Sequence, residues 1–209
     1  MRVKICGITS PEHALVAAAS GADYLGFVFA PSKRRVTIEQ ATRLVATVRD
    51  AGYLTPMVGL FVNETSAQIA TTVASVGLDI VQLHGDEPFV QLDELPIMPI
   101  WRAVRLRGDA QEAEWLTRAS THVTLLVDAY VPDAFGGTGV RADWEAAAAL
   151  ASKRPIVLAG GLNPRNVREA IQTVKPWCVD VSSGVERAGY KDNGLIAAFI
   201  DIAKQERTS

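Results

Sequence analysis

The sequence predicts an α/β fold, a single (β/α)8 TIM barrel with eight parallel strands. Eight short apolar runs rich in β-branched residues are typical of buried parallel strands, and they span residues 3–6, 24–29, 57–62, 80–83, 100–104, 123–127, 156–158 and 178–181. Segments with helical spacing lie between them, and we expect helices at residues 13–19, 38–48, 67–76, 144–151 and 167–174. No linker or shift in composition divides the chain, so residues 1–209 are expected to form one domain.

Capping signals support these helices. Two helices are expected to begin at an N-cap residue followed by proline, at Ser10-Pro11 and Asn163-Pro164. Thr37, followed three residues later by Gln40, forms a capping box. Three glycines lie just after helical segments, where helices commonly end: Gly21, Gly52 and Gly77.

Alternating strands and helices are compatible with a closed barrel or with a doubly wound open sheet. Eight units favour the barrel. An open sheet that binds dinucleotides would carry G-x-G-x-x-G directly after its first strand, whereas residues 6–9 read CGIT. The 209 residues are few for such a barrel, so short loops and small anionic ligands are expected.

Charge and cysteine content exclude several classes of protein. The formal net charge of −2 provides no overall positive field for nucleic acid or an anionic membrane. The apolar run at the N-terminus is too short for a signal peptide, and no apolar stretch is long enough to span a membrane, so we expect a cytoplasmic protein. Two cysteines are too few for a disulfide framework, and their spacing matches no zinc motif.

Two loops rich in glycine and serine predict a phosphate site. The active site of such a barrel forms where the strands run into the following loops. Gly160 and Gly161 follow the seventh predicted strand, and Ser182, Ser183 and Gly184 follow the eighth. Their backbone N–H groups and hydroxyls would lie side by side, where barrels usually bind phosphate. The alternative for either loop alone is that its glycines only turn the chain.

Cys6 and Asp128 end the first and sixth predicted strands, where a thiolate and a carboxylic acid could flank a small substrate. The alternatives are a small buried hydrophobe for Cys6 and a local hydrogen bond for Asp128. Cys178 begins the eighth strand, so we expect it in the core and not in a disulfide with Cys6. His84 ends the fourth strand, where it could contact substrate or simply pack.

Several segments carry a specific resemblance: KICGIT (4–9), GFVF (26–29), VGLFVN (58–63), QLHG (82–85), GGTG (136–139), AGGLNP (159–164) and VDVSSGVE (179–186). In this order and spacing they resemble the phosphoribosylanthranilate isomerase family of tryptophan biosynthesis, essentially from end to end. The resemblance implies the third step from chorismate to tryptophan, an Amadori rearrangement without cofactor or metal. It also implies a phosphorylated small-molecule substrate, and we favour a monomer with no nucleic-acid or membrane partner.

The resemblance also assigns roles. Cys6 would remove the proton from ribose C2, and Asp128 would protonate the furanose oxygen as the ring opens. Arg34 would bind the anthranilate carboxylate, His84 would line the pocket, and the two loops would hold the phosphate. Where relatives commonly have an aromatic residue, this chain has Arg35, which leaves open which arginine binds the carboxylate. The segment 136–139 resembles a flexible loop that could close over substrate.

The base role requires at least partial ionisation of Cys6, which a cation such as Lys4 or a helix N-terminus would favour and a nearby phosphate would oppose. Rival functions are an aldolase-like lyase, a metal-dependent pentose-phosphate epimerase, and a barrel that only binds a metabolite. The predicted strand ends offer no clear Schiff-base lysine, and only His84 is well placed as a metal ligand. The presence of both Cys6 and Asp128 argues against a non-catalytic barrel.

Overall fold

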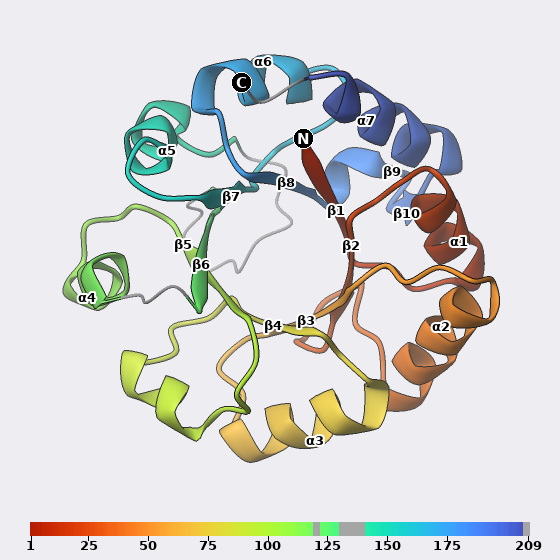
Figure 1. Cartoon of the computed structure of the whole chain (residues 1–209), viewed down its shortest axis with the longest axis horizontal. Helices are drawn as coiled ribbons and strands as arrows, with labels where there is room; N and C mark the ends of the chain where they lie inside the picture. Colours follow the sequence, from red (N-terminus) through yellow and green to blue (C-terminus); the bar gives the residue numbers. More distant parts are fainter. Residues whose placement is uncertain (119–121, 130–140, 207–209) are drawn as a thin grey trace.

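The chain forms a closed barrel of parallel strands inside a ring of helices, in a computed structural model that describes residues 1–118, 122–129 and 141–206 (Figure 1). The strands are β1 (Arg2–Cys6), β2 (Tyr24–Val28), β3 (Met57–Phe61), β4 (Ile80–Leu83), β5 (Ile100–Val104), β6 (Val123–Val127), β7 (Ile156–Leu158) and β8 (Cys178–Val181). The helices are α1 (Pro11–Ala19), α2 (Ile38–Asp50), α3 (Ser66–Val76), α4 (Ala110–Arg118), α5 (Trp144–Ala151), α6 (Val167–Val174) and α7 (Asn193–Gln205). Each strand pairs with the next, and β8 pairs with β1 to close the ring.

The predicted barrel is confirmed, with every strand within one residue of its expected bounds. The five predicted helices are present, whereas α4 and α7 were not among them. The crossover after β4 contains the 3-10 helix η1 (Phe89–Glu94). Pro88 precedes η1 in an extended conformation, and Pro96 follows shortly after it, which leaves little room for an α-helix.

Most of the capping predictions are confirmed. The Ser10 side chain accepts a hydrogen bond from the His13 N–H, and Thr37 and Gln40 form the complete capping box. The three glycines that follow helices have positive φ: Gly21, Gly52 and Gly77. The prediction at Asn163-Pro164 was wrong, because α6 begins only after Asn166. The Asn163 side chain caps the turn before it, accepting from the Arg165 N–H at 2.9 Å.

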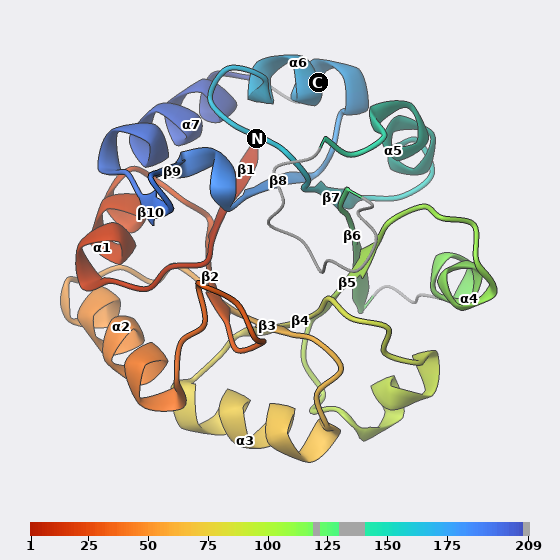
Figure 2. The ribbon, with the colours of Figure 1, turned by 180° about the vertical axis from the view of Figure 1, so that it is seen from behind.

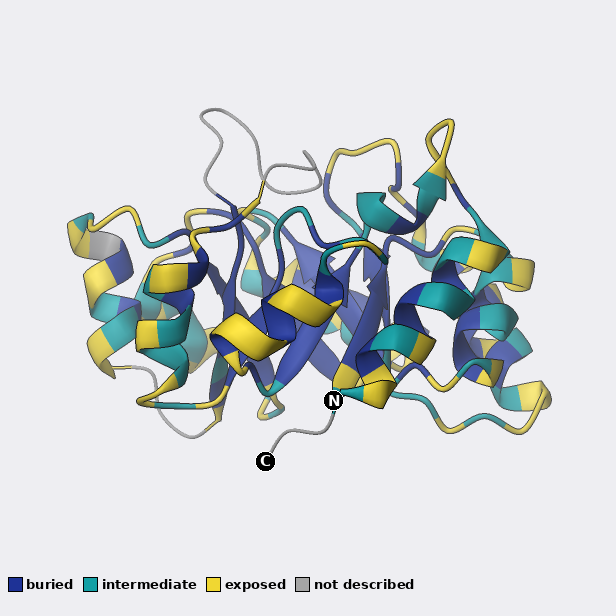
Figure 3. Cartoon of the chain, turned by 90° about the horizontal axis from the view of Figure 1, so that it is seen from above, coloured by how far each residue is buried: buried dark blue, intermediate teal, exposed yellow. Residues whose placement is uncertain are grey.

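The core has two layers, one inside the barrel and one between the strands and the helices. Figure 3 shows the strands as a buried centre with half-exposed helices around it. Side chains alternate along each strand, so every second residue points inward. The inner layer contains mostly apolar residues: Val58, Ile80, Trp101, Ala103, Leu126, Val157, Ala159 and Cys178. As predicted, Cys178 is a buried core residue, and both cysteines are free thiols.

A short hairpin not predicted from the sequence follows β8. The chain passes through the 3-10 helix η2 (Ser183–Val185) into β9 (Glu186–Arg187) and β10 (Tyr190–Lys191), which pair in antiparallel fashion. Ala188 and Gly189 make the turn with φ of 52° and 85°. In Figures 1 and 2 the hairpin is seen beside α1, on the side of this helix that faces the barrel. It places two charged residues, Glu186 and Lys191, next to the loop that follows β8.

Candidate active site

Cys6 lies inside the barrel at the carboxyl end of β1, where it packs in a small cluster with Val28 and Leu60. In the strand register Cys6 is opposite Gly26 of β2. A Cβ at Gly26 would lie 2.9 Å from both Cys6 Sγ and Lys4 Cε. The missing side chain of Gly26 therefore leaves the space in which the thiol and the Lys4 side chain meet.

Lys4 provides a buried positive charge beside this thiol. It precedes Cys6 by two residues and so faces the same side of β1, with 0% of the residue exposed. Its ammonium donates to Asp180 Oδ2 at 2.9 Å, and Asp180 is its register partner on β8. Burial lowers the pKa of Lys4, but the charges of Asp180 and Cys6 more than compensate and raise it. Lys4 is therefore an ammonium ion.

The ionisation of Cys6 depends on opposing effects. Burial raises the pKa of the Cys6 thiol, and the positive charge of Lys4 is the largest influence that lowers it. The carboxylate of Asp180 raises the pKa of the thiol, and Lys191 on β10 lowers it. On balance the pKa of the Cys6 thiol is raised. Formation of the thiolate therefore depends on the positive charge of Lys4.

Asp128 follows β6 directly and is buried at the same end of the barrel. Its Oδ2 lies 3.0 Å from His84 Nε2, and its Oδ1 accepts the Ala129 N–H at 2.8 Å. Burial raises the pKa of Asp128, but the hydrogen bond and charge of His84 outweigh it and lower the pKa. The structure thus brings the predicted residues Asp128 and His84 into direct contact.

The two predicted phosphate loops lie against each other. Gly160 and Gly161 have φ of 80° and 66°, and a Cβ at Gly160 would lie 2.6 Å from the Ala129 nitrogen. A Cβ at Gly184 would overlap the Leu162 carbonyl, so the loops after β7 and β8 pack backbone to backbone. Among the described residues, no side chain caps the start of η2. Backbone N–H groups there suit an anion.

Ser182 and Ser183 lie between β8 and η2. The Ser182 hydroxyl donates to the Cys6 carbonyl oxygen at 3.1 Å, which ties the loop after β8 to the end of β1. Lys191 Nζ donates to the Ser182 carbonyl oxygen at 2.8 Å. The predicted phosphate loop is therefore joined directly to the strand that carries the thiol.

Arg34 is buried, whereas Arg35 is exposed. The Arg34 guanidinium donates to both carboxylate oxygens of Glu186, from Nε at 2.6 Å and from Nη2 at 2.9 Å. Burial raises the pKa of Glu186, but hydrogen bonds from Arg34 and Lys191 lower it to about 2. A Cβ at Gly7 would lie 2.5 Å from Arg34 Cδ, so the arginine passes directly over the end of β1.

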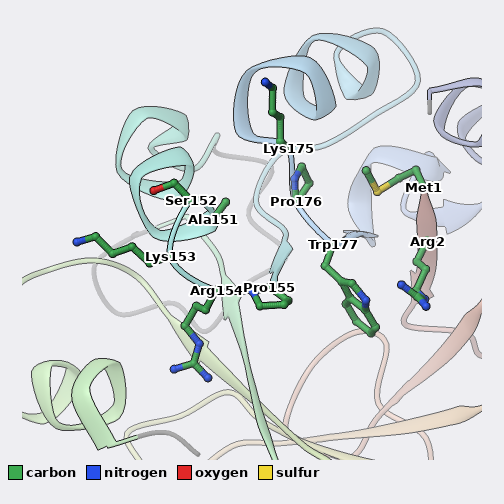
Figure 4. Close-up of a pocket in the computed structure, with 10 residues that line it drawn as sticks. All are labelled: Met1, Arg2, Ala151, Ser152, Lys153, Arg154, Pro155, Lys175, Pro176 and Trp177. Atoms are coloured by element: carbon green, nitrogen blue, oxygen red, sulfur yellow. The ribbon is translucent and has the colours of Figure 1, made fainter. Parts of the chain in front are cut away.

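An open pocket of about 740 Å³ lies at the opposite end of the barrel (Figure 4). Its lining residues precede or begin strands rather than follow them: Pro155 and Trp177 come directly before β7 and β8, and Arg2 is the first residue of β1. Arg2 and Cys6 are separated along β1 by roughly 13 Å at about 3.3 Å per residue. This pocket is therefore separate from the residues described above.

Three further expectations concern a metal ion, a membrane span and the segment 136–139. In the part of the chain that the structure describes, no group of three His, Cys, Asp or Glu side chains is placed to hold a metal ion. No helix among the described residues is long and apolar enough to cross a membrane. The segment 136–139, expected to be a flexible loop, lies outside the described residues.

A buried thiol, carboxyl group and imidazole thus lie at the loop end of the barrel, near two glycine loops. A family model described as N-(5'phosphoribosyl)anthranilate (PRA) isomerase matches residues 3–202. The chain belongs to this family. The resemblance carried by the sequence motifs is thereby confirmed, and membership in the phosphoribosylanthranilate isomerase family assigns the chain an isomerase step of tryptophan biosynthesis.

Relatives within the phosphoribosylanthranilate isomerase family are similar along their whole length. N-(5'-phosphoribosyl)anthranilate isomerase of Roseiflexus castenholzii is 51% identical over 208 residues, covering 98% of each chain. The crystal structure of the enzyme from Thermotoga maritima has 39% identity and a TM-score of 0.86, covering 99% of this chain and 100% of that one. Another, in complex with reduced 1-(o-carboxyphenylamino)-1-deoxyribulose 5-phosphate, has 38% identity and a TM-score of 0.83 with the same coverage.

Sequence reasoning missed three partners of the predicted residues. They are Asp180 opposite Lys4, Gln82 beside His84, and Glu186 bonded to Arg34. Gln82 and Asp180 are polar residues within apolar strands, at even spacing from His84 and Ser182. That spacing was a usable signal, because residues two apart in a strand point to the same side.

Proposed function

We propose that this chain converts N-(5'-phosphoribosyl)anthranilate into 1-(2-carboxyphenylamino)-1-deoxyribulose 5-phosphate, with Cys6 as general base and Asp128 as general acid. Asp128 would protonate the furanose oxygen as its bond to C1 breaks, and Cys6 would then take the proton from C2. The observation that carries the proposal is a buried thiol beside a buried ammonium at the end of β1, with a buried carboxyl group at the end of β6 of the same barrel.

The substrate's phosphate would bind at Gly160, Gly161, Ser182, Ser183 and Gly184, whose loops pack together. The related isomerase that was solved in complex with a 5-phosphate ligand supports a phosphorylated substrate for this chain. The direct test is an assay of the purified chain with freshly generated phosphoribosylanthranilate, followed by the loss of anthranilate-type fluorescence. Turnover supports the proposal, and its absence in correctly folded protein would contradict it.

Replacing Lys4 with methionine should move the acidic limb of the kcat/KM profile to higher pH by about one to three pH units. The reason is that Cys6 must be a thiolate to act as base, and loss of the neighbouring ammonium raises the pKa of the thiol. Activity then rises only at higher pH. The measurement is kcat/KM across the pH range, with folding checked by circular dichroism.

The matched control is the double variant Lys4→Met/Asp180→Asn, which removes both charges of the buried pair. The Asp180 carboxylate also raises the pKa of the thiol, so the double variant should show a smaller displacement than Lys4→Met alone. An acidic limb that stays at its wild-type position in both variants would show that Lys4 does not tune the base.

Of the two adjacent arginines, we propose that Arg34 binds the anthranilate carboxylate. Lysine at position 34 keeps the charge but loses the planar fork, so Arg34→Lys should raise KM by roughly tenfold to a hundredfold, with a smaller change in kcat. Arg35→Ala is the control, because Arg35 is exposed, and its KM should stay within about twofold of wild type. The reverse pattern of KM values would assign the carboxylate to Arg35.

We also propose that the chain acts as a single-domain monomer, residues 1–209, in the cytoplasm. Two free buried thiols suit a reducing compartment. Each residue proposed here for base, acid or substrate binding comes from the same barrel, so the site needs no residue from a second copy. A related enzyme from Thermotoga maritima is described as dimeric, which makes the oligomeric state of this chain a point for direct measurement.

A further inference from the structure

Three buried side chains form a hydrogen-bonded chain from β4 to the end of β6: Gln82, His84 and Asp128. Gln82 Nε2 lies 2.9 Å from His84 Nδ1, and His84 Nε2 lies 3.0 Å from Asp128 Oδ2. An amide nitrogen only donates hydrogen bonds, so Nδ1 of His84 must accept. The proton of the neutral ring is then on Nε2. This N–H donates a hydrogen bond to the Asp128 carboxylate.

This arrangement conflicts with the acid role that the proposed function gives to Asp128. Both of its oxygens accept hydrogen bonds, from His84 and from the Ala129 N–H, and both bonds favour the charged form. Arg105, whose guanidinium donates to the His84 carbonyl oxygen at 2.8 Å, is the other charged group that lowers the pKa of Asp128. A general acid must carry a proton before each turnover.

The amide of Gln82 offers a way out of this conflict. Its Oε1 is buried and has no hydrogen-bond partner among the described residues. An unsatisfied buried acceptor destabilises the arrangement that contains it. Rotation of the amide by half a turn would bring Oε1 to His84 Nδ1, which would then have to carry a proton. Nε2 could in turn accept a hydrogen bond from a protonated Asp128.

We propose that Gln82 is a positioning residue whose amide orientation selects the protonation site of His84 and thereby allows Asp128 to hold its acid proton. The rotated arrangement holds one more proton on the His84–Asp128 pair, and water supplies it. During turnover Asp128 gives a proton to the ring oxygen, which keeps the electron pair of the broken C–O bond. Cys6 takes the C2 proton and releases it to water, so the protons balance over a cycle.

The first test is the protonation of His84 in ligand-free protein, measured by nitrogen NMR with ¹⁵N-labelled histidine. The other histidines are His13 and His122, and a His84→Gln variant identifies the His84 signals. For the amide orientation seen in the structure we expect Nδ1 to be unprotonated and Nε2 protonated. A ring protonated on Nδ1 across the whole pH range would overturn the proposal.

The second test changes the amide. Glutamate at position 82 only accepts hydrogen bonds, so Gln82→Glu should keep Nδ1 protonated and move the basic limb of kcat/KM upward by at least about one pH unit. Gln82→Met offers neither a donor nor an acceptor to His84 Nδ1. Its kcat should fall by up to roughly 10²–10⁴-fold, which is the contribution of a general acid, with little change in KM. Gln172→Glu, the same charge change on an exposed part of α6, should leave both profiles unchanged.

Wild-type pH profiles and wild-type His84 signals in both position-82 variants would overturn the proposal. If Gln82→Glu fails to fold, Gln82→Met and the spectra of the wild-type protein still decide. The inference rests on the proposed function only for its kinetic test. A wild-type chain without turnover would contradict the proposed function. The histidine spectra would still show whether the Gln82 amide selects the protonation site of His84.

Discussion

Replacing Cys6 with alanine should lower kcat by roughly 10²–10⁴-fold while KM stays close to its wild-type value. In the proposed mechanism the thiolate acts on the C2 proton only after substrate has bound, so its loss should affect the transition state more than binding. Alanine fits the space beside Gly26, so the fold should be kept. The measurement is the fluorescence assay under saturating substrate, with substrate binding followed separately.

Cys178→Ala is the matched control for this variant. Cys178 is also a buried free thiol inside the barrel, but it begins β8 at the end away from the loops. It should keep its kcat, at a modest cost in stability for the smaller core side chain. Near-normal kcat in Cys6→Ala, or an equal loss in both variants, would remove Cys6 from the role of base.

Replacing Asp128 with asparagine should produce a loss of similar size, again roughly 10²–10⁴-fold in kcat. Asparagine keeps the shape of the side chain and can still contact His84, but it has no proton to give to the ring oxygen. The remaining activity should lose the pH dependence that comes from the acid. The measurement is kcat against pH for wild type and variant under the same conditions.

The control for the acid is His84→Gln, which leaves Asp128 in place without its imidazole partner. Loss of the His84 hydrogen bond should raise the pKa of Asp128. This variant should therefore keep part of its activity, and the basic limb of its kcat profile should move to higher pH. Asp128→Asn with a wild-type kcat would mean that another group protonates the substrate.

The barrel could be predicted from the sequence because each buried parallel strand is a continuous apolar run with polar residues or turns at its ends. The strand after Ala22 and the strand before Gly160 illustrate how clearly these runs are bounded. The crossover after β4 was less predictable, because prolines around η1 replace an α-helix by a tighter turn. Helix α7 has an N-cap at Asp192 and an apolar face, a signal that the prediction left unused.

The positions of the site residues were predictable, but their partners were not. Cys6, His84 and Asp128 each stand at the end of an apolar run, and position in a barrel strand is enough to place them at one mouth. Which residue lies opposite which depends on strand register, and short strands of similar composition carry little information about it. The contact between Arg34 and Glu186 depends further on the hairpin after β8, which has no long apolar run.

The position of Cys6 and its charged neighbours on the strands themselves has a consequence for how activity responds to partial unfolding. Loops commonly open by themselves at low free-energy cost, whereas barrel strands open only when the whole core does. Cys6 and the Lys4–Asp180 pair lie on β1 and β8, the two strands that close the ring. The proposed chemistry is therefore built into the most cooperative unit of the fold, and the proposed base loses its position only when the closed sheet opens.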